Sequence, residues 1–183
     1  MLEEYLIECC SPTLASLKTA NLFSFPFSSE SELYRQTAHW NEVLEPKGVT
    51  ITVLKQRENA ALLYVYRRAK LREDLAKKGV RKFMSECGYE SLSIDAAIEQ
   101  LCSRLGQNGE FPHEIGLFLG YPLDDVVGFI RNGGKNYKCT GLWKVYCNEV
   151  EAVKTFAKFK KCSSVYARLW SMGRSVPQLT VRA

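Results

Sequence analysis

The sequence predicts an α+β fold: a single domain over residues 1–183, with a small antiparallel sheet of three to four strands covered by about five to seven helices. Three observations lead to this prediction. A period-two pattern of apolar and hydroxyl side chains runs from Val49 to Leu54, and a second strand-like segment follows from Ala60 to Tyr66. Apolar residues recur at helical spacing through much of the remaining chain. With 183 residues, 46% of them hydrophobic, the chain can bury a core without disulfides or metal ions.

The N-terminal segment predicts a short amphipathic helix over residues 2–10 that ends before Ser11-Pro12, because proline inside a helix lacks the N–H donor. The apolar positions of residues 13–22 predict a second element. The aromatic segment 23–29, which contains Pro26, is interpreted as a loop.

The central part of the chain alternates helices and strands. Ser29 and Glu32 form a capping-box pattern that predicts a helix ending before Pro46. An antiparallel hairpin is expected next. The predicted elements are strands over 49–56 and 60–67 and helices over 70–78, 80–86 and 93–105.

The C-terminal third predicts two short helices over 113–119 and 122–131, joined at Gly120-Tyr121. A third strand of the sheet is expected over 141–147. A long helix follows over 149–172, and 176–182 is a candidate edge strand.

Residues 114–130 have the skeleton of a DNA-binding helix-turn-helix. A recognition helix presents polar and basic side chains to base edges and phosphates. This second helix instead carries Asp124 and Asp125, whose carboxylates repel phosphates. The pattern therefore favours packing into the protein core and disfavours nucleic acid as a partner. We expect Asp124 and Asp125 at the surface or capping the helix, and buried side chains at Val126, Phe129 and Ile130.

His113 and Glu114 begin one of the expected helices. An imidazole in this position can cap the helix, transfer a proton or ligate a bound group. A carboxylate in the first turn is also explained by the helix dipole. The pair matches the first half of a zinc-protease helix, but Leu117 stands where the second histidine is needed. No metal site is therefore predicted.

The glycine-rich segment 133–139 could surround a phosphate with backbone N–H groups and with Lys135, although it lacks the Gly-Lys-Ser/Thr ending of a P-loop. Lys138 and Lys144 could lower the pKa of Cys139 and make its thiolate reactive. The alternative is a small buried cysteine, which is the more common fate of a free thiol.

Aromatic and cationic side chains complete the set of candidates. Trp143 and Tyr146 lie on opposite faces of the expected strand and can line a pocket for a planar ligand, but core packing would explain at least one of them. Lys18 and Arg67 could supply charge, although Lys18 could also be a surface lysine at a helix end.

Charge is distributed unevenly along the chain. Residues 131–183 hold eleven Lys and Arg against two Glu, whereas residues 1–130 hold fourteen against eighteen acidic groups. This basic C-terminal region either favours an anionic partner or forms a solvated face. The acidic start does not match an export signal, and the apolar stretch 115–123 is too short to cross a bilayer. Seven cysteines without regular spacing favour free thiols in the cytoplasm.

The chain resembles an uncharacterised bacterial family, domain of unknown function number 3793, found mostly in anaerobes. The most specific string is Phe111-Pro-His-Glu-Ile-Gly-Leu-Phe-Leu-Gly-Tyr-Pro122, and the resemblance covers nearly the full chain. Ser11 and Ser16 stand where that family is expected to have Ala and Gly. The resemblance implies no established activity. Further matching residues are Pro12, Lys18, Asp125, Gly128, Lys138-Cys139, Trp143 to Tyr146, Lys161-Cys162, Tyr166 and Gly173 to Ser175.

Together these patterns predict a cytoplasmic protein that binds a small anionic ligand, or a cofactor of unknown kind, in a pocket around His113, the 133–139 loop and Trp143. The alternatives are a DNA-binding regulator that uses residues 114–130 and a protein-interaction adaptor. Whether the protein is an enzyme stays open. The candidate catalytic residues are His113 and Cys139, and the candidate ligand-binding residues are Lys18, Arg67, Glu114, Lys135, Trp143, Lys144 and Tyr146.

Overall fold

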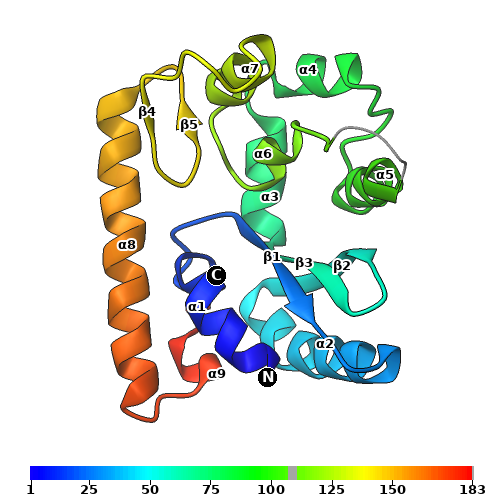
Figure 1. The fold of residues 1–183 in the computed structure, drawn as a ribbon, viewed down its shortest axis with the longest axis vertical. Helices are drawn as coiled ribbons and strands as arrows, with labels where there is room; N and C mark the ends of the chain where they lie inside the picture. The colour runs from blue at the N-terminus through cyan, green and yellow to red at the C-terminus, as the bar shows by residue number, and fades with distance from the viewer. Residues whose placement is uncertain (107–110, 183) are drawn as a thin grey trace.

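A three-stranded antiparallel sheet lies between two groups of helices in the computed structural model, which describes residues 1–106 and 111–182 (Figure 1). Strand β3 (Ala60–Arg67) is central, between β1 (Ala20–Pro26) and β2 (Val49–Gln56). The predicted hairpin of β2 and β3 and the α+β class are thus confirmed. The sheet separates two apolar clusters, because alternate residues of β3 face opposite sides.

Strand β1 corrects the interpretation of residues 23–29 as a loop. Phe23 pairs with Leu63 and Phe25 pairs with Ala61, so most of this segment lies in the sheet. Pro26 stands at the end of an edge strand, where a missing N–H interrupts no ladder. Proximity to β3, rather than local sequence, makes this segment a strand.

Helix α1 (Leu2–Leu14) continues past Ser11-Pro12, so its predicted end was wrong. Proline removes only the hydrogen bond to the carbonyl of Glu8, which is an exposed residue, and the Ser11 hydroxyl donates to the carbonyl of Ile7. The helix ends at Leu14, and two residues later the chain turns at Ser16, whose φ of 56° lies in the left-handed region that glycine adopts most easily.

One face of the sheet is covered by α1, α2 (Glu30–Leu44), the short 3-10 helix η1 (Glu45–Lys47) and α9 (Val176–Leu179). Ser29 caps α2 as predicted, because its hydroxyl accepts the N–H of Glu32 at 3.2 Å. The predicted edge strand over 176–182 was wrong. Gln178 bonds back to the N–H of Ser175 at 3.0 Å, and this capping box starts a helical turn instead.

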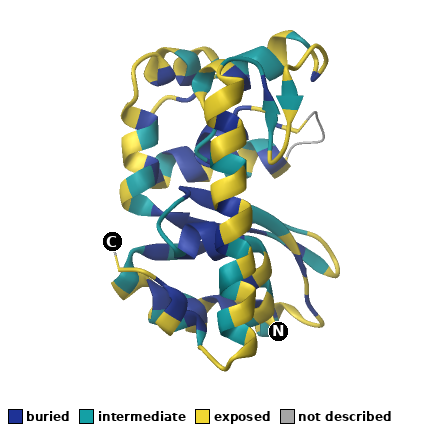
Figure 2. Ribbon diagram, turned by 90° about the vertical axis from the view of Figure 1, so that its left-hand side faces the viewer, coloured by how far each residue is buried: buried dark blue, intermediate teal, exposed yellow. Residues whose placement is uncertain are grey.

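The other face packs against α3 (Arg68–Ala76), α4 (Val80–Glu86), α5 (Ile94–Gly106), α6 (Ile115–Phe118) and α7 (Leu123–Arg131). Tyr64 and Tyr66 share this face of β3, with ring centroids 4.7 Å apart. The Tyr64 hydroxyl donates to the carbonyl of Phe118 at 2.6 Å and so connects the sheet to α6. Buried residues concentrate along the sheet and the helix faces that contact it (Figure 2).

The segment 139–145 forms a separate two-stranded ribbon of β4 (Cys139–Thr140) and β5 (Lys144–Val145), not a third strand of the main sheet as predicted. Helix α8 (Glu149–Ser171) follows and runs along one side of the molecule, past the ribbon and α1 (Figure 1). The ribbon pairs only with itself because it connects α7 to α8 at a distance from the sheet. No helix in the described ranges is both long and apolar enough to cross a membrane.

Candidate functional site

The corner between α6 and α7 depends on two close approaches. A Cβ at Gly116 would lie 2.8 Å from Cγ2 of Val126, so the two helices pack with no room for a side chain. Gly120 has a φ of 78°, and a Cβ there would lie 2.7 Å from the Thr19 hydroxyl. Glycine at both positions lets Tyr121 follow the turn directly and extend toward the β4–β5 ribbon.

A cavity of about 480 Å³ lies between this corner and the ribbon. Its walls are mainly apolar and aromatic, and its acidic and basic side chains are His113, Asp125 and Lys144. We call it the aromatic cavity. Its lining residues are Phe111, His113, Ile115, Gly116, Tyr121, Asp125, Val126, Phe129, Thr140, Gly141, Leu142, Trp143 and Lys144.

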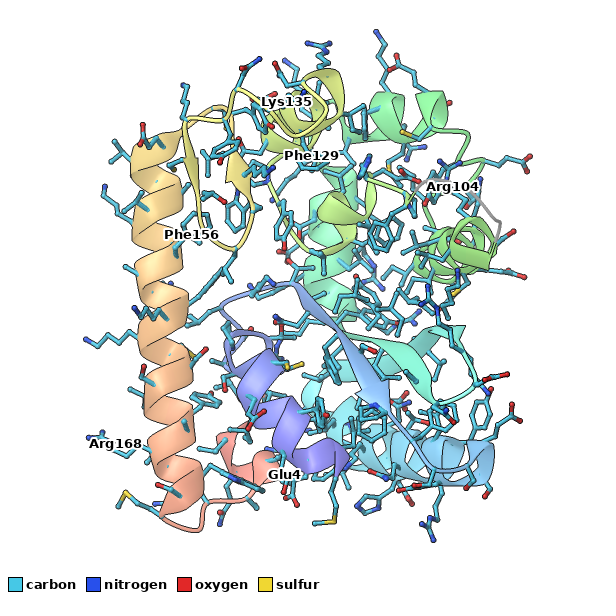
Figure 3. All side chains as sticks on the ribbon, viewed as in Figure 1. Glu4, Arg104, Phe129, Lys135, Phe156 and Arg168 are labelled. Carbon is cyan, nitrogen blue, oxygen red and sulfur yellow. The ribbon has the colours of Figure 1, made fainter. Side chains whose placement is uncertain are left out.

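Trp143 is held on three sides. Its ring stacks on Tyr121 with centroids 4.7 Å apart and meets the edge of Phe156 of α8 at 4.5 Å. Its indole N–H donates to Oδ2 of Asp125 at 2.8 Å. Phe156 extends from α8 toward the ribbon (Figure 3). Trp143 is therefore a wall of the aromatic cavity, held in place by its neighbours.

Asp125 has a role that sequence reasoning missed. Its side chain is buried, and Oδ1 accepts the backbone N–H groups of Tyr146 at 2.7 Å and Cys147 at 2.9 Å. Burial acts to raise the pKa of this carboxyl, but these bonds and the one from Trp143 outweigh it and hold the pKa below its usual value. The surface position allowed for Asp125 was wrong. Helical spacing to Phe129 was the available signal, because residues four apart share a face.

The hydrophobic pattern expected of α7 holds only in part. Val126 is buried, whereas Phe129 is half-buried and Ile130 is 41% exposed. Phe129 lines the aromatic cavity rather than filling the core. Asp124 stays exposed, as expected.

Lys144 and His113 flank Phe129 at this cavity. The Lys144 ammonium donates to the carbonyl of Gly134 at 2.7 Å and lies 5.7 Å from the centroid of the Phe129 ring. It also lies 5.0 Å from the ring of Tyr137. His113 is exposed, and its ring meets Phe129 at 4.9 Å between centroids. Both residues are thus at the predicted pocket.

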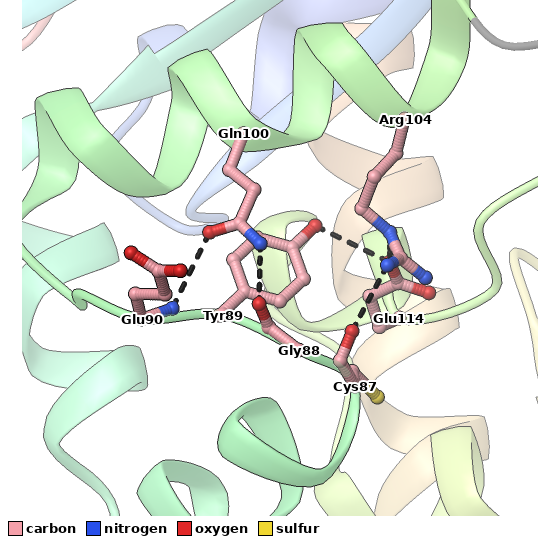
Figure 4. A network of polar contacts seen from close by, with 7 residues as sticks. All are labelled: Cys87, Gly88, Tyr89, Glu90, Gln100, Arg104 and Glu114. Carbon is pink, nitrogen blue, oxygen red and sulfur yellow. Dashed lines mark hydrogen bonds and ion pairs between the residues drawn. The ribbon is translucent and has the colours of Figure 1, made fainter.

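Glu114 does not line the aromatic cavity, although it is the next residue after His113. Its buried carboxylate forms an ion pair with Arg104 of α5 at 2.6 Å and accepts the Tyr89 hydroxyl at 3.2 Å (Figure 4). Arg104 also donates to the carbonyl of Cys87 at 2.9 Å. Glu114 therefore connects α6 to α5 and to the end of α4, a structural role in place of the predicted ligand contact.

The glycine-rich segment does not surround an anion. The N–H groups of Gly133, Gly134 and Lys135 donate to the carbonyls of Ile130, Phe129 and Asn132, respectively. Three donors that were expected to be free therefore terminate α7 instead. Lys135 is exposed at the outer end of the molecule (Figure 3) and does not line the cavity. The phosphate-loop interpretation was wrong because the helix end uses these N–H groups.

Cys139 is half-buried in β4 and does not line the cavity. Burial raises its pKa, and the carboxylates of Glu149 and Asp125 raise it further. Neither expected cation offsets this effect, since Lys138 donates to the carbonyl of Cys147 and Lys144 to that of Gly134. The prediction of a lowered pKa for Cys139 was wrong.

Tyr146 packs against α7 instead of lining the cavity. A Cβ at Gly128 would lie 2.5 Å from Cγ of Tyr146, so the absent side chain makes room for the ring. Its buried hydroxyl has no hydrogen-bond partner among the described residues. Burial raises the pKa of this phenol.

Arg67 lies far from the cavity, at the end of β3, and is fully buried. Its guanidinium donates to the carbonyls of Thr13 at 2.6 Å, Leu14 at 2.7 Å, Val181 at 2.8 Å and Lys47 at 3.1 Å. Burial lowers its pKa. Arg67 joins α1, η1 and the C-terminal segment, so its predicted ligand contact is replaced by a structural one. Lys18 borders a second cavity.

In the ranges 1–106 and 111–182, no group of three or more His, Cys, Asp and Glu side chains is placed to hold a metal ion. Comparison with curated proteins and with solved structures finds no match. The family described as "Protein of unknown function (DUF3793)" matches residues 6–180, which is nearly the whole chain and agrees with the resemblance seen in the sequence. The chain therefore belongs to the DUF3793 family.

Proposed function

We propose that this protein binds a small, planar, anionic ligand in the aromatic cavity. The observation that carries the proposal is the stack of Tyr121 and Trp143 beside a cation in one cavity of about 480 Å³. Ligand sites are commonly concave, mainly apolar and supplied with a few polar groups that set orientation. Aromatic walls suit a flat ring system, because offset stacking adds to the burial of apolar surface.

Lys144 is the group that would select an anion. An ammonium has three donors, and the structure accounts for one of them, the bond to Gly134. Among the described residues Asp125 forms no ion pair with Lys144, and its oxygens instead accept three N–H groups. His113 at the rim can donate a hydrogen bond or transfer a proton, so an enzymatic role is compatible with the same site.

The seven free cysteines suit a reducing compartment, which supports a cytoplasmic location as part of this proposal. A DNA-binding role has less support. Helix α6 is a single turn, α7 exposes Asp124, and the one basic residue of α7 is Arg131 at its end. An adaptor role is supported by no specific surface that we can name.

Two dyes with the same ring skeleton test the proposal. Anilinonaphthalene sulfonate carries a flat naphthalene ring system and a negative charge, and phenylnaphthylamine has the same rings without the sulfonate. We expect the native protein to bind the sulfonate dye with enhanced fluorescence. Lys144→Met should weaken that binding about tenfold, since a charge-assisted hydrogen bond is lost, and should leave phenylnaphthylamine binding unchanged.

Matched variants make the result specific. Lys135→Met removes the same charge from an exposed position outside the cavity and should change neither dye. Phe111→Ala removes a lining ring that is 49% exposed, so it should weaken both dyes without unfolding the protein. Equal losses for Lys144→Met and Lys135→Met, or equal losses of both dyes with Lys144→Met, would show that the cavity does not select an anion.

A further inference from the structure

A second cavity of about 320 Å³ shares Trp143 with the aromatic cavity as a lining residue. It is bordered by the segment between α1 and β1, by α3, by the α6–α7 turn and by α8. We call it the lysine cavity. In contrast to the aromatic cavity, it is rich in charged groups, which are Lys18, Lys70, Glu73, Asp74 and Lys77.

Lys18 is a buried cation without a counterion. Its side chain is only 7% exposed, and no carboxylate within the described ranges lies within ion-pairing distance of its ammonium. The ammonium lies 5.6 Å from the ring centroid of Tyr121, a cation–π contact that offsets part of the lost hydration. Burial lowers its pKa to about 8. A charge held this way costs free energy unless an anion reaches it.

The carboxylates around the cavity do not fill that role. Asp74 forms an ion pair with Lys77 through Oδ1 and accepts the Thr19 hydroxyl at Oδ2. Glu73 is exposed. Lys70 on α3 is half-buried and also has no ion pair within the described residues. The ammonium groups of Lys18 and Lys70 thus border one cavity, and within the described residues neither forms an ion pair with a carboxylate.

We propose that the lysine cavity binds a compact anion, a phosphate, sulfate or carboxylate group, between the ammonium groups of Lys18 and Lys70. The anion would replace the missing counterion of Lys18 and gain charge-assisted hydrogen bonds in a partly dry site. Gly120 closes one wall, where a Cβ would lie 3.2 Å from Oδ2 of Asp74, so the Thr19–Asp74 contact is packed against the turn and held in place. This site is distinct from the aromatic cavity.

Binding at this site should depend on the protonation of Lys18. Cys10 and Tyr121, which lie near it, stay uncharged up to pH 9 because burial raises the pKa of both, that of Tyr121 to about 12. The remaining charged groups facing the cavity are Lys70, Glu73, Asp74 and Lys77. Only the protonated amine of Lys18 attracts an anion, so apparent affinity scales with its protonated fraction. Raising the pH from 7 to 9 should weaken binding about tenfold.

Calorimetric titration with sodium sulfate tests the proposal, since sulfate keeps its charge over this pH range. We expect binding at pH 7 that is lost in Lys18→Met, weakened severalfold in Lys70→Met and unchanged in Lys78→Met. Lys78 is exposed, lies just beyond α3 and does not border the cavity, so this variant is a matched loss of charge. Phosphate and acetate, titrated in the same way, distinguish a phosphoryl from a carboxylate preference.

Several outcomes would overturn the proposal. One is a sulfate dissociation constant of the native protein above about 10 mM. Another is an affinity for sulfate that is the same at pH 7 and pH 9. The third is a loss of sulfate affinity in Lys78→Met as large as that in Lys18→Met. If Lys18→Met does not fold, Lys70→Met carries the test, because its side chain is only half-buried. Lys144→Met should leave sulfate binding unchanged, so that failure here and failure of the aromatic cavity are distinguishable.

Discussion

Within residues 1–106 and 111–182, Arg67 and Lys18 are both buried cations without a carboxylate partner, but their hydrogen-bond donors meet different surroundings. The Arg67 guanidinium donates to four backbone carbonyls and lines neither the aromatic nor the lysine cavity. The Lys18 ammonium has a ring on one side and a cavity on the other. A buried charge with four of its five donors accepted by backbone carbonyls supports the fold, whereas one with unused donors beside a cavity is a candidate for binding.

The largest expected effect is at the Arg67 junction. Arg67→Met should destabilise the protein by about 3–5 kcal/mol, because four carbonyl groups, two of them in buried and two in part-buried hydrogen bonds, lose their donor at once. The adjacent Arg68 forms an exposed two-bond contact with Asp95. Arg68→Met should therefore cost less than about 1 kcal/mol. Urea denaturation of the two variants measures the difference, and similar losses would contradict a structural role specific to Arg67.

The second prediction concerns Asp125, the buried carboxylate near the ribbon whose oxygens accept three N–H groups. Asp125→Ala leaves three N–H donors unpaired and should cost about 2–4 kcal/mol. The exposed neighbour provides the control: Asp124→Ala should cost less than about 1 kcal/mol. Thermal unfolding followed by tryptophan fluorescence would report both.

The Asp125 effect should also depend on pH in a definite direction. Because the folded protein holds the pKa of Asp125 below 3.8, the carboxylate stabilises the fold above that value, and the stabilisation is lost as the pH falls through the lower, folded-state pKa. The difference in free energy of unfolding between the native protein and Asp125→Ala should therefore decrease below about pH 4. A difference that increases on acidification would contradict the ionised, hydrogen-bonded state of Asp125.

Lys18 should behave in the opposite way to Arg67. Its pKa is lowered to about 8 in the folded state, from 10.5, so the unfolded chain holds more protons between these values and stability rises with pH there. Without added anions, Lys18→Met should stabilise the protein at pH 7 on the order of 2 kcal/mol. This increase in the free energy of unfolding should disappear as the pH approaches 10.5. Destabilisation by Lys18→Met at pH 7 would place Lys18 with Arg67 as a structural cation.

The smallest expected effect concerns the thiols. Burial raises the pKa of Cys139, Cys147 and Cys9, so we expect Cys139 to react with limiting iodoacetamide no faster than the other two. Cys10 is fully buried and should be labelled last. Peptide mass spectrometry after brief treatment reads the order, and early, selective labelling of Cys139 would restore it as a reactive cysteine.

Some of the candidate residues chosen from the sequence line the aromatic cavity, and others form contacts within the fold instead. His113, Trp143 and Lys144 lie at one cavity because the α6–α7 corner brings the start of α6 and the ribbon together. Glu114 and Arg67 were chosen for their charge, but their partners come from other elements. Charge indicates that a residue needs partners and says nothing of whether backbone, another side chain or a ligand provides them.

What the sequence determined by itself is the set of elements whose signals are local. Ser29 and the apolar spacing of α2 and α8 specify helices, and the alternation of β2 and β3 specifies a hairpin, because each depends on neighbours within a few residues. Tertiary structure decided the rest. Strand β1 forms because its residues pair with the free edge of β3. The ribbon of β4 and β5 forms where the chain crosses from α7 to α8. Asp125 is buried because its carboxylate accepts the N–H groups of Tyr146 and Cys147, which lie about twenty residues further along the chain. Without Asp125, these part-buried N–H groups would have no acceptor.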